Sequence, residues 1–160
     1  IDKDFKKYEE YGPLRGLEFQ KDLEKISYYA GGRSQTAPAQ RVTDFVEGKL
    51  STNLNDCSYQ PGLKSAPLHS LLPKIIGSRL RKGFKEFGKK MNGYYTEQAN
   101  IVGVESRTSS PINIPRNINL EHINIKGLFP CGEGGGYAGG IVSAAMDGER
   151  CAEAAIKILE

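Results

Sequence analysis

Glycines crowd a short stretch near the end of the sequence. Six of the ten residues 131–140 are glycine, and one acid, Glu133, stands among them. Glycine loses more conformational entropy on folding than any other residue, so such a stretch is costly unless the backbone must bend or lie against a ligand. A helical pattern follows at 141–159, and a helix N-terminus carries unpaired N–H groups and a partial positive charge. The stretch therefore predicts a site for an anionic or electron-rich group, with Glu133 able to accept hydrogen bonds from sugar-like hydroxyls.

Residues 134–139 also fit G-x-G-x-x-G, the fingerprint of dinucleotide-binding folds. A Rossmann unit needs a second strand after the helix and an acid about 20 residues further on. The sequence ends at Glu160, so we expect no complete Rossmann site unless another polypeptide segment supplies that strand. A simpler interpretation stays open: the glycines let a helix pack closely on a sheet, and Glu133 is an exposed acid that assists the helix N-terminus.

Three short strands are predicted around this stretch. Residues 128–130 form an apolar run before the glycines, 99–105 is rich in β-branched residues, and 111–115 alternates isoleucine with polar neighbours. The small residues of 141–159 would let the last helix approach a sheet closely.

Helical periodicity predicts the earlier elements. Residues 14–30 follow Pro13 and end at two glycines, and 72–91 carries apolar residues at three- and four-residue steps. A short helix is expected around 42–46, and 47–67 is expected to be a loop. The fold class predicted is α/β, or mixed α+β, with helices around a small sheet and a terminal strand, glycine loop and helix.

Composition narrows the classes of protein. The 160 residues suffice for one domain with a core, and the 38% hydrophobic and 26% charged residues are typical of a soluble globular protein. A net charge of +3 with dispersed Lys and Arg does not indicate nucleic-acid binding, and no run of about 20 apolar residues could span a bilayer. The sequence begins at Ile1 without a methionine or a signal core, so we expect the C-terminal fragment of a longer polypeptide. The three cysteines are Cys57, Cys131 and Cys151. Their odd number and the lack of a C-x-x-C pair indicate reduced thiols in a cytoplasmic protein and no metal site.

Five blocks of the sequence resemble a bacterial family of FAD-dependent dehydrogenases, often labelled NAD(FAD)-utilising dehydrogenases. The longest is GLFPCGEGGGYAGGIVSAAMDG at 127–148, which is similar to the C-terminal flavin motif of that family. Shorter blocks are APAQRV at 37–42, SYQPG at 58–62, LLP at 71–73 and ESRTSSP at 105–111. The resemblance extends over nearly the whole chain.

The resemblance implies a split FAD-binding domain. Glu133 would hold the ribityl chain of FAD, and the backbone after it would face the pyrophosphate or the pyrimidine edge of the flavin. Residues 99–160 would be the C-terminal part of this domain, and 1–98 the remainder of a largely helical substrate or cap region. An N-terminal Rossmann segment would hold the adenosine half, so this chain alone would bind FAD weakly or not at all. The residues implied in cofactor binding are Gly132, Glu133, Gly134, Gly135, Gly136, Tyr137, Ala138, Gly139, Gly140 and Ile141.

Two more side chains are candidates for chemistry. Arg107 could stabilise a reduced flavin anion or clamp a substrate carboxylate, because its planar guanidinium suits both. The alternative is an ion pair with Glu105 or a cover over a sheet edge. Cys131 could meet the flavin as a reactive thiol, but a small buried residue at a strand end is the favoured interpretation.

The remaining polar groups are expected to be structural. His69 and His122 have no Ser, Asp or metal-ligand partner at a recognisable spacing. Gln40 and Arg41 could contact substrate or anchor a loop, and both interpretations stay open. The Lys and Arg residues of 74–90 could hold an acidic partner, although a solvated helix face is the default.

The sequence thus predicts the C-terminal fragment of a FAD-dependent oxidoreductase, in which the cofactor carries hydride or electron transfer and the protein orients it. NADH or NADPH is a candidate electron donor, and Arg107 is the candidate catalytic residue; no side chain is a convincing general acid or base. The expected partner is the N-terminal Rossmann portion, with no metal, nucleic acid or membrane, and the isolated fragment is not expected to be active. The alternative function is a cofactor-free interaction domain whose basic amphipathic helix holds an acidic partner.

Overall fold

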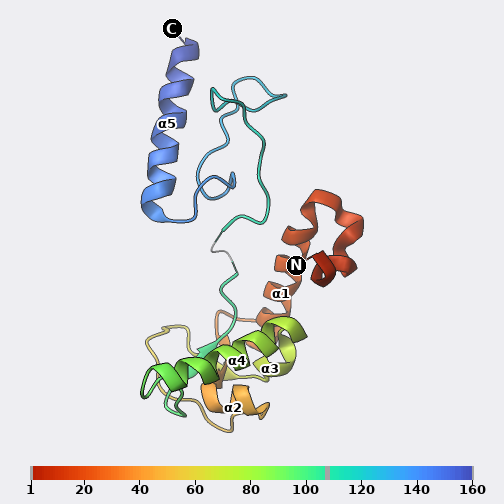
Figure 1. Cartoon of the computed structure of the whole chain (residues 1–160), viewed down its shortest axis with the longest axis vertical. Helices are drawn as coiled ribbons and strands as arrows, with labels where there is room; N and C mark the ends of the chain where they lie inside the picture. Colours follow the sequence, from red (N-terminus) through yellow and green to blue (C-terminus); the bar gives the residue numbers. More distant parts are fainter. Residues whose placement is uncertain (1, 107–108, 160) are drawn as a thin grey trace. The chain divides into compact units, whose positions relative to one another are not determined.

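The computed structural model describes residues 2–106 and 109–159, which divide into two compact units. One unit is Gln20–Val104, and the other combines Ile1–Phe19 with Glu105–Glu160. The predicted fold class, α/β or mixed α+β, is confirmed in its mixed α+β form, with helices and a small three-stranded sheet (Figure 1). The proposed boundary between residues 98 and 99 stays a prediction.

The chain begins with a 3₁₀ helix, η1 (Asp2–Leu14), which is kinked at Gly12. The first α-helix, α1 (Arg15–Ala30), follows directly and confirms the predicted helix at 14–30. It ends at the expected glycine pair: Gly31 N donates to Ser27 O at 2.8 Å, and Gly32 has a φ of 94°. A left-handed glycine at the end of a helix is the usual stop signal.

The sheet has the order β2-β1-β3. Its central strand is β1 (Ala37–Arg41), whose three middle residues are buried. The strand β2 (Leu63–Ser65) pairs with it in parallel, with Ala37 opposite Leu63, although 47–67 was expected to be a loop throughout. The strand β3 (Asn100–Val102) pairs antiparallel, with Ala39 opposite Val102, inside the predicted strand 99–105.

Three helices pack near this sheet. The short helix α2 (Val42–Glu47) confirms the expectation at 42–46. The predicted helix 72–91 is shorter, because Pro73 separates α3 (Leu68–Leu71) from α4 (Lys74–Lys90). A residue before proline is disfavoured in the helical region, and Leu72 is extended with ψ 145°. The buried side chains of Phe45, Val46 and Leu68 form the core, against which Leu71, Leu72, Phe84, Tyr95 and Ile101 pack.

The other unit contains α5 (Ile141–Leu159) and a long irregular segment that runs beside it (Figure 1). The helix was predicted with these bounds. The strands predicted at 111–115 and 128–130 are wrong, because neither stretch pairs with a neighbouring strand in the described part of the chain. An extended segment becomes a strand only through such pairing, and both stretches instead bond to side chains and turns.

Within residues 2–106 and 109–159, no helix has the length and apolar character needed to cross a membrane.

Candidate functional site

The glycine loop, residues 131–140, folds into consecutive turns before α5. Gly136 N donates to Glu133 O, and Tyr137 N donates to Gly132 O, each at 3.0 Å. Gly132 and Gly136 have positive φ values of 65° and 83°. A Cβ at Gly136 would lie 2.5 Å from Ile112 O, so the fold itself requires glycine there.

The segment before the loop holds it in place. Ile114 N donates to Gly135 O at 3.1 Å, and the Asn113 side chain donates to Gly136 O at 3.1 Å. In return, the Tyr137 hydroxyl donates to Ile114 O at 2.7 Å. The alternating pattern at 111–115, which predicted a strand, therefore belongs to a strap around the glycine loop.

Two glycines of the loop have no such steric reason. A Cβ at Gly134 or Gly139 would meet no atom within 4 Å, and neither residue has a positive φ. A Cβ at Gly140 would be in ordinary contact with Ser143 Oγ at 3.6 Å. The space that a side chain would occupy at Gly134 and Gly139 is thus not filled by any described residue of the chain.

The N-terminal turn of α5 is open. Ala144 N donates to Gly140 O at 2.9 Å, which is the first bond of the helical ladder. The N–H groups of residues 138–141 make no hydrogen bond to any residue that the structure describes. Ile141 and Val142 are 91% and 72% exposed, so the turn is uncovered at these two residues.

Glu133 lies in the first turn of the loop with a half-buried side chain. Its carboxylate forms neither a hydrogen bond nor an ion pair with any residue in 2–106 or 109–159. A carboxylate in that condition can still accept hydrogen bonds. The residues implied in cofactor binding thus fall into two groups. The N–H groups of Gly132, Gly135, Gly136 and Tyr137 donate within the chain, whereas those of the other six donate to no residue in the ranges 2–106 and 109–159.

Sequence reasoning missed an ion pair beneath the loop. Arg116 and Asp147 are 31 residues apart and form two hydrogen bonds of 2.9 and 2.7 Å. Hydrogen bonding to Arg116 holds the pKa of Asp147 below its usual value, and the Asp147 carboxylate raises the pKa of Arg116. The sequence offered one signal for this pair: Asp147 is an acid placed among the small residues of the terminal helix.

The cysteines differ from expectation. Cys131 is exposed, so its interpretation as a small buried residue at a strand end is wrong; the buried residue here is its neighbour Pro130. Cys151 is buried, and its Sγ lies 3.9 Å from Pro130 O. Burial raises the pKa of the Cys151 thiol, while the nearby Arg116 guanidinium acts in the opposite direction.

Arg107, the candidate catalytic residue, lies outside the described residues. Gln40 is fully buried and bonded to its surroundings: its Nε2 contacts His69 Nδ1 at 2.8 Å and donates to Lys49 O, and its Oε1 accepts His69 N. Gln40 is therefore a structural anchor. His122 is structural as well, because its Nδ1 accepts two backbone N–H groups of the following turn at 3.1 Å.

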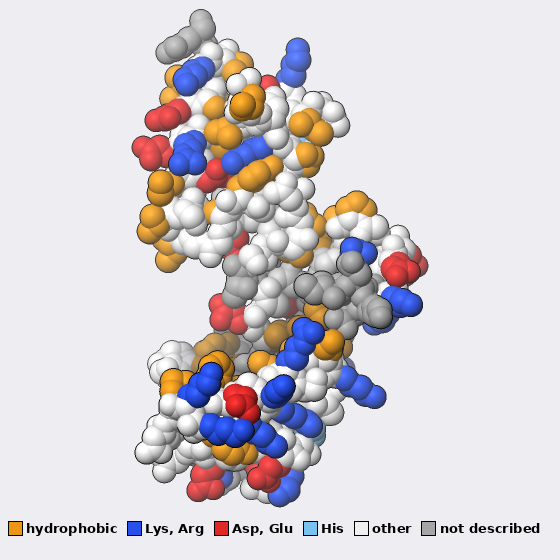
Figure 2. Space-filling view, viewed as in Figure 1, with side chains coloured by type: hydrophobic (Ala, Val, Ile, Leu, Met, Phe, Trp, Pro, Cys, Tyr) orange, Lys and Arg blue, Asp and Glu red, His pale blue; other side chains and the backbone are white. Residues whose placement is uncertain are grey.

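The basic side chains of α4 cover an exposed face, and Figure 2 shows Lys and Arg side chains gathered over this helix. Lys89 pairs with Glu86 at 2.9 Å, while Arg81 lies over the Phe45 ring at 5.8 Å. The exposed Lys89–Glu86 pair agrees with a solvated helix face, whereas Arg81 packs against the core residue Phe45. No group of three or more potential metal ligands occurs in the part of the chain that the structure describes.

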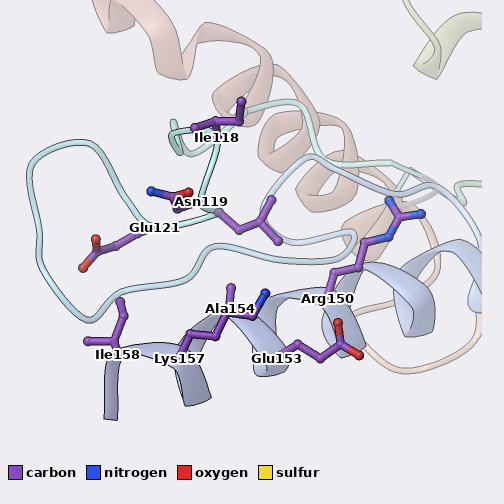
Figure 3. Close-up of a pocket in the computed structure, with 9 residues that line it drawn as sticks. Ile118, Asn119, Glu121, Arg150, Glu153, Ala154, Lys157 and Ile158 are labelled. Carbon is purple, nitrogen blue, oxygen red and sulfur yellow. The ribbon is translucent and has the colours of Figure 1, made fainter. Parts of the chain in front are cut away.

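A hollow of about 480 Å³ lies beside the C-terminal half of α5 (Figure 3). Arg150, Glu153 and Lys157 line it from the helix, and Asn119 and Glu121 line it from the preceding loop. Arg150 follows Ile141 by nine residues, or roughly 14 Å of helix. The hollow is therefore separate from the open N-terminal turn.

Comparison with known proteins adds two findings. A family model described as "FAD-dependent protein, C-terminal domain-like" matches residues 1–108. An uncharacterised protein of Clostridium beijerinckii is 45% identical over 143 residues, a match that covers 88% of this chain and 27% of the relative. The chain thus spans about a quarter of that relative's length. A match over 88% of the chain necessarily includes the glycine loop, which lies outside the family-model match.

Proposed function

Because the chain belongs to the family of FAD-dependent proteins with this C-terminal domain, we propose that it is the C-terminal part of a FAD-dependent oxidoreductase and supplies one wall of the flavin site. In this proposal the glycine loop and the first turn of α5 face the ribityl chain and the pyrophosphate. Residues 99–160 complete the FAD-binding domain, and 1–98 belong to a substrate or cap region.

One observation carries the proposal: the loop exposes bare backbone at Gly134 and Gly139 for which the described chain has no use. A ligand that lies against the main chain accounts for both positions. The open N–H groups at residues 138–141 suit the negative charge of a pyrophosphate. The residues present therefore fit the group that the family binds.

The chain's own residues would bind and orient the cofactor. Glu133 would accept hydrogen bonds from ribityl hydroxyls, and the N-terminal turn of α5 would place N–H dipoles toward phosphate oxygens. When bound, FAD supplies the hydride or electron transfer. NADH or NADPH is the proposed electron donor, and Arg107 remains the proposed group for tuning the flavin or clamping a substrate.

The proposed partner is the N-terminal Rossmann portion of the same polypeptide. The relative is more than three times as long as its match to this chain, which leaves room for such a portion. One side of α5 is apolar and exposed, with Val142, Met146 and Ile156 at 72%, 50% and 54%. Figure 2 shows hydrophobic side chains gathered over the N-terminal end of this helix. An apolar helix face of this kind is typical of a surface that packs against another element.

The test uses the full-length polypeptide. We expect the purified protein to show the absorption spectrum of bound flavin, and a colourless protein after incubation with FAD would refute the proposal. Glu133→Ala should weaken FAD retention on a desalting column. The matched control is Glu97→Ala, which removes an exposed acid of the other unit and should leave retention unchanged. Equal retention by all three proteins would reject the role of Glu133 while leaving the cofactor assignment intact.

A further inference from the structure

The Arg116–Asp147 pair is nearly buried, with side chains only 11% and 9% exposed. Arg116 Nη2 lies 2.7 Å from Asp147 Oδ1, and Nη1 lies 2.9 Å from Oδ2. Two parallel hydrogen bonds hold guanidinium and carboxylate in one relative orientation. A buried pair contributes little net stability, because desolvation of both charges offsets most of their attraction. The fixed orientation of these two side chains therefore needs an explanation other than stability.

The pair also binds the glycine loop at its entrance. Asp147 Oδ2 accepts the N–H of Gly132 at 2.9 Å, and Arg116 Nη1 donates to Pro130 O at 2.9 Å. The backbone on both sides of Cys131 is therefore held by the same two side chains.

The pair binds the last turn of the loop as well. The Arg116 guanidinium lies over the Tyr137 ring, with 3.5 Å between its central carbon and the ring centroid. A planar cation so close to an aromatic face is a favourable cation–π arrangement. Tyr137 N in turn donates to Gly132 O, which closes the loop onto its own entrance.

Gly132 is the hinge through which this arrangement affects Glu133. Its φ of 65° is left-handed, and its peptide unit leads directly to Glu133. The bond from Gly132 N to Asp147 fixes the peptide unit before the Gly132 Cα, and the bond from Tyr137 N to Gly132 O fixes the peptide unit between Gly132 and Glu133. The direction in which the chain presents Glu133 thus depends on Asp147.

We propose that Arg116 and Asp147 are positioning residues for FAD: they shape the glycine loop so that Glu133 and the open backbone of the loop are presented to the cofactor. This inference rests on the proposed function for its ligand, but its structural part concerns the loop alone. Neither residue needs to touch FAD, because both act through Gly132 and Glu133.

Two variants of the full-length polypeptide test the inference. Asp147→Asn removes the charge that holds Arg116, and the milder Arg116→Lys keeps a cation but loses the fork and the planar stack on Tyr137. The control is Glu86→Gln, which breaks the exposed pair with Lys89. We measure amide hydrogen exchange of the peptide spanning residues 130–138 without FAD, and then the FAD dissociation constant.

Both variants should exchange faster in residues 130–138 while residues 37–47 keep their protection, and FAD should bind at least tenfold more weakly. If the residues act through Glu133, adding Glu133→Ala to either variant costs less affinity than it costs the wild type. The control should match the wild type in both measurements.

Unchanged exchange in residues 130–138 would overturn the inference whatever FAD does. Faster exchange with unchanged FAD affinity, or strictly additive losses with Glu133→Ala, would also overturn it, since the pair would then be merely structural. A wild type that binds no FAD would reject the proposed function, while the exchange measurement would still decide whether the pair holds the loop.

Discussion

Alanine substitutions in the glycine loop separate what the fold requires from what a ligand requires. At Gly139 an added Cβ meets nothing within 4 Å and the φ is not left-handed. Gly→Ala at such a position raises the free energy of unfolding by about 0.4–1 kcal/mol, because the unfolded chain becomes less flexible. If FAD lies against this backbone, the methyl group overpacks the contact at about 1–3 kcal/mol. FAD affinity should then fall by roughly 5- to 150-fold.

Gly136→Ala is the opposite case. Its φ of 83° costs alanine about 1–2 kcal/mol. Its Cβ would lie 2.5 Å from Ile112 O and 2.9 Å from the Cα of Asn113, which adds about 1–3 kcal/mol of overpacking. The free energy of unfolding should therefore fall by about 2–5 kcal/mol.

The assay is urea unfolding of each full-length variant without FAD, followed by titration with FAD. Gly139→Ala should keep or gain stability and lose FAD affinity, whereas Gly136→Ala should lose stability already without FAD. Unchanged FAD affinity in Gly139→Ala would remove the main support for a flavin against this loop. A neutral effect of Gly136→Ala on unfolding would show that the loop is held differently from the geometry described.

Three further predictions concern stability and reactivity. The folded-state pKa of Asp147 is lowered, so the contribution of its carboxylate to stability is present above the ordinary aspartate pKa of about 3.9 and is lost as pH falls through the lower folded value. The difference in unfolding free energy between wild type and Asp147→Asn should therefore be constant near neutrality and shrink below about pH 4. Urea unfolding at a series of acid pH values measures this difference. Phe45→Ala, which empties a fully buried core position, should lower the free energy of unfolding by about 3–5 kcal/mol in the same assay. Iodoacetamide should modify exposed Cys131 well before buried Cys151 at neutral pH, as mass spectrometry of the folded protein would show, and equal rates would contradict the burial described here.

The elements that were predictable from the sequence are those with local signals. The helices α1, α2 and α5 follow from apolar spacing and from glycine or proline at their ends, and the glycine loop follows from its composition. Pro73 was readable as a break, yet the apolar stripe of 72–91 continued across it and suggested one helix.

The parts that could not be predicted depend on partners far away in the sequence. Ile112 and Ile114 alternate as in a strand, but that stretch bonds to a loop more than 20 residues later. Arg116 and Asp147 are ordinary charged residues until the fold brings them together beneath the loop. The orientation of Glu133, the central residue of the proposed site, thus rests on side chains that no local pattern identifies.

The division of the chain into a continuous unit and one made from both of its ends has a consequence for biosynthesis. Residues 20–104 leave the ribosome as a complete set, so their core can form while translation continues. At the usual rate of elongation, residue 147 is added roughly 2–9 s after residue 104. The glycine loop cannot be held by Asp147 before that residue has been added, so the loop is completed only when α5 is being translated.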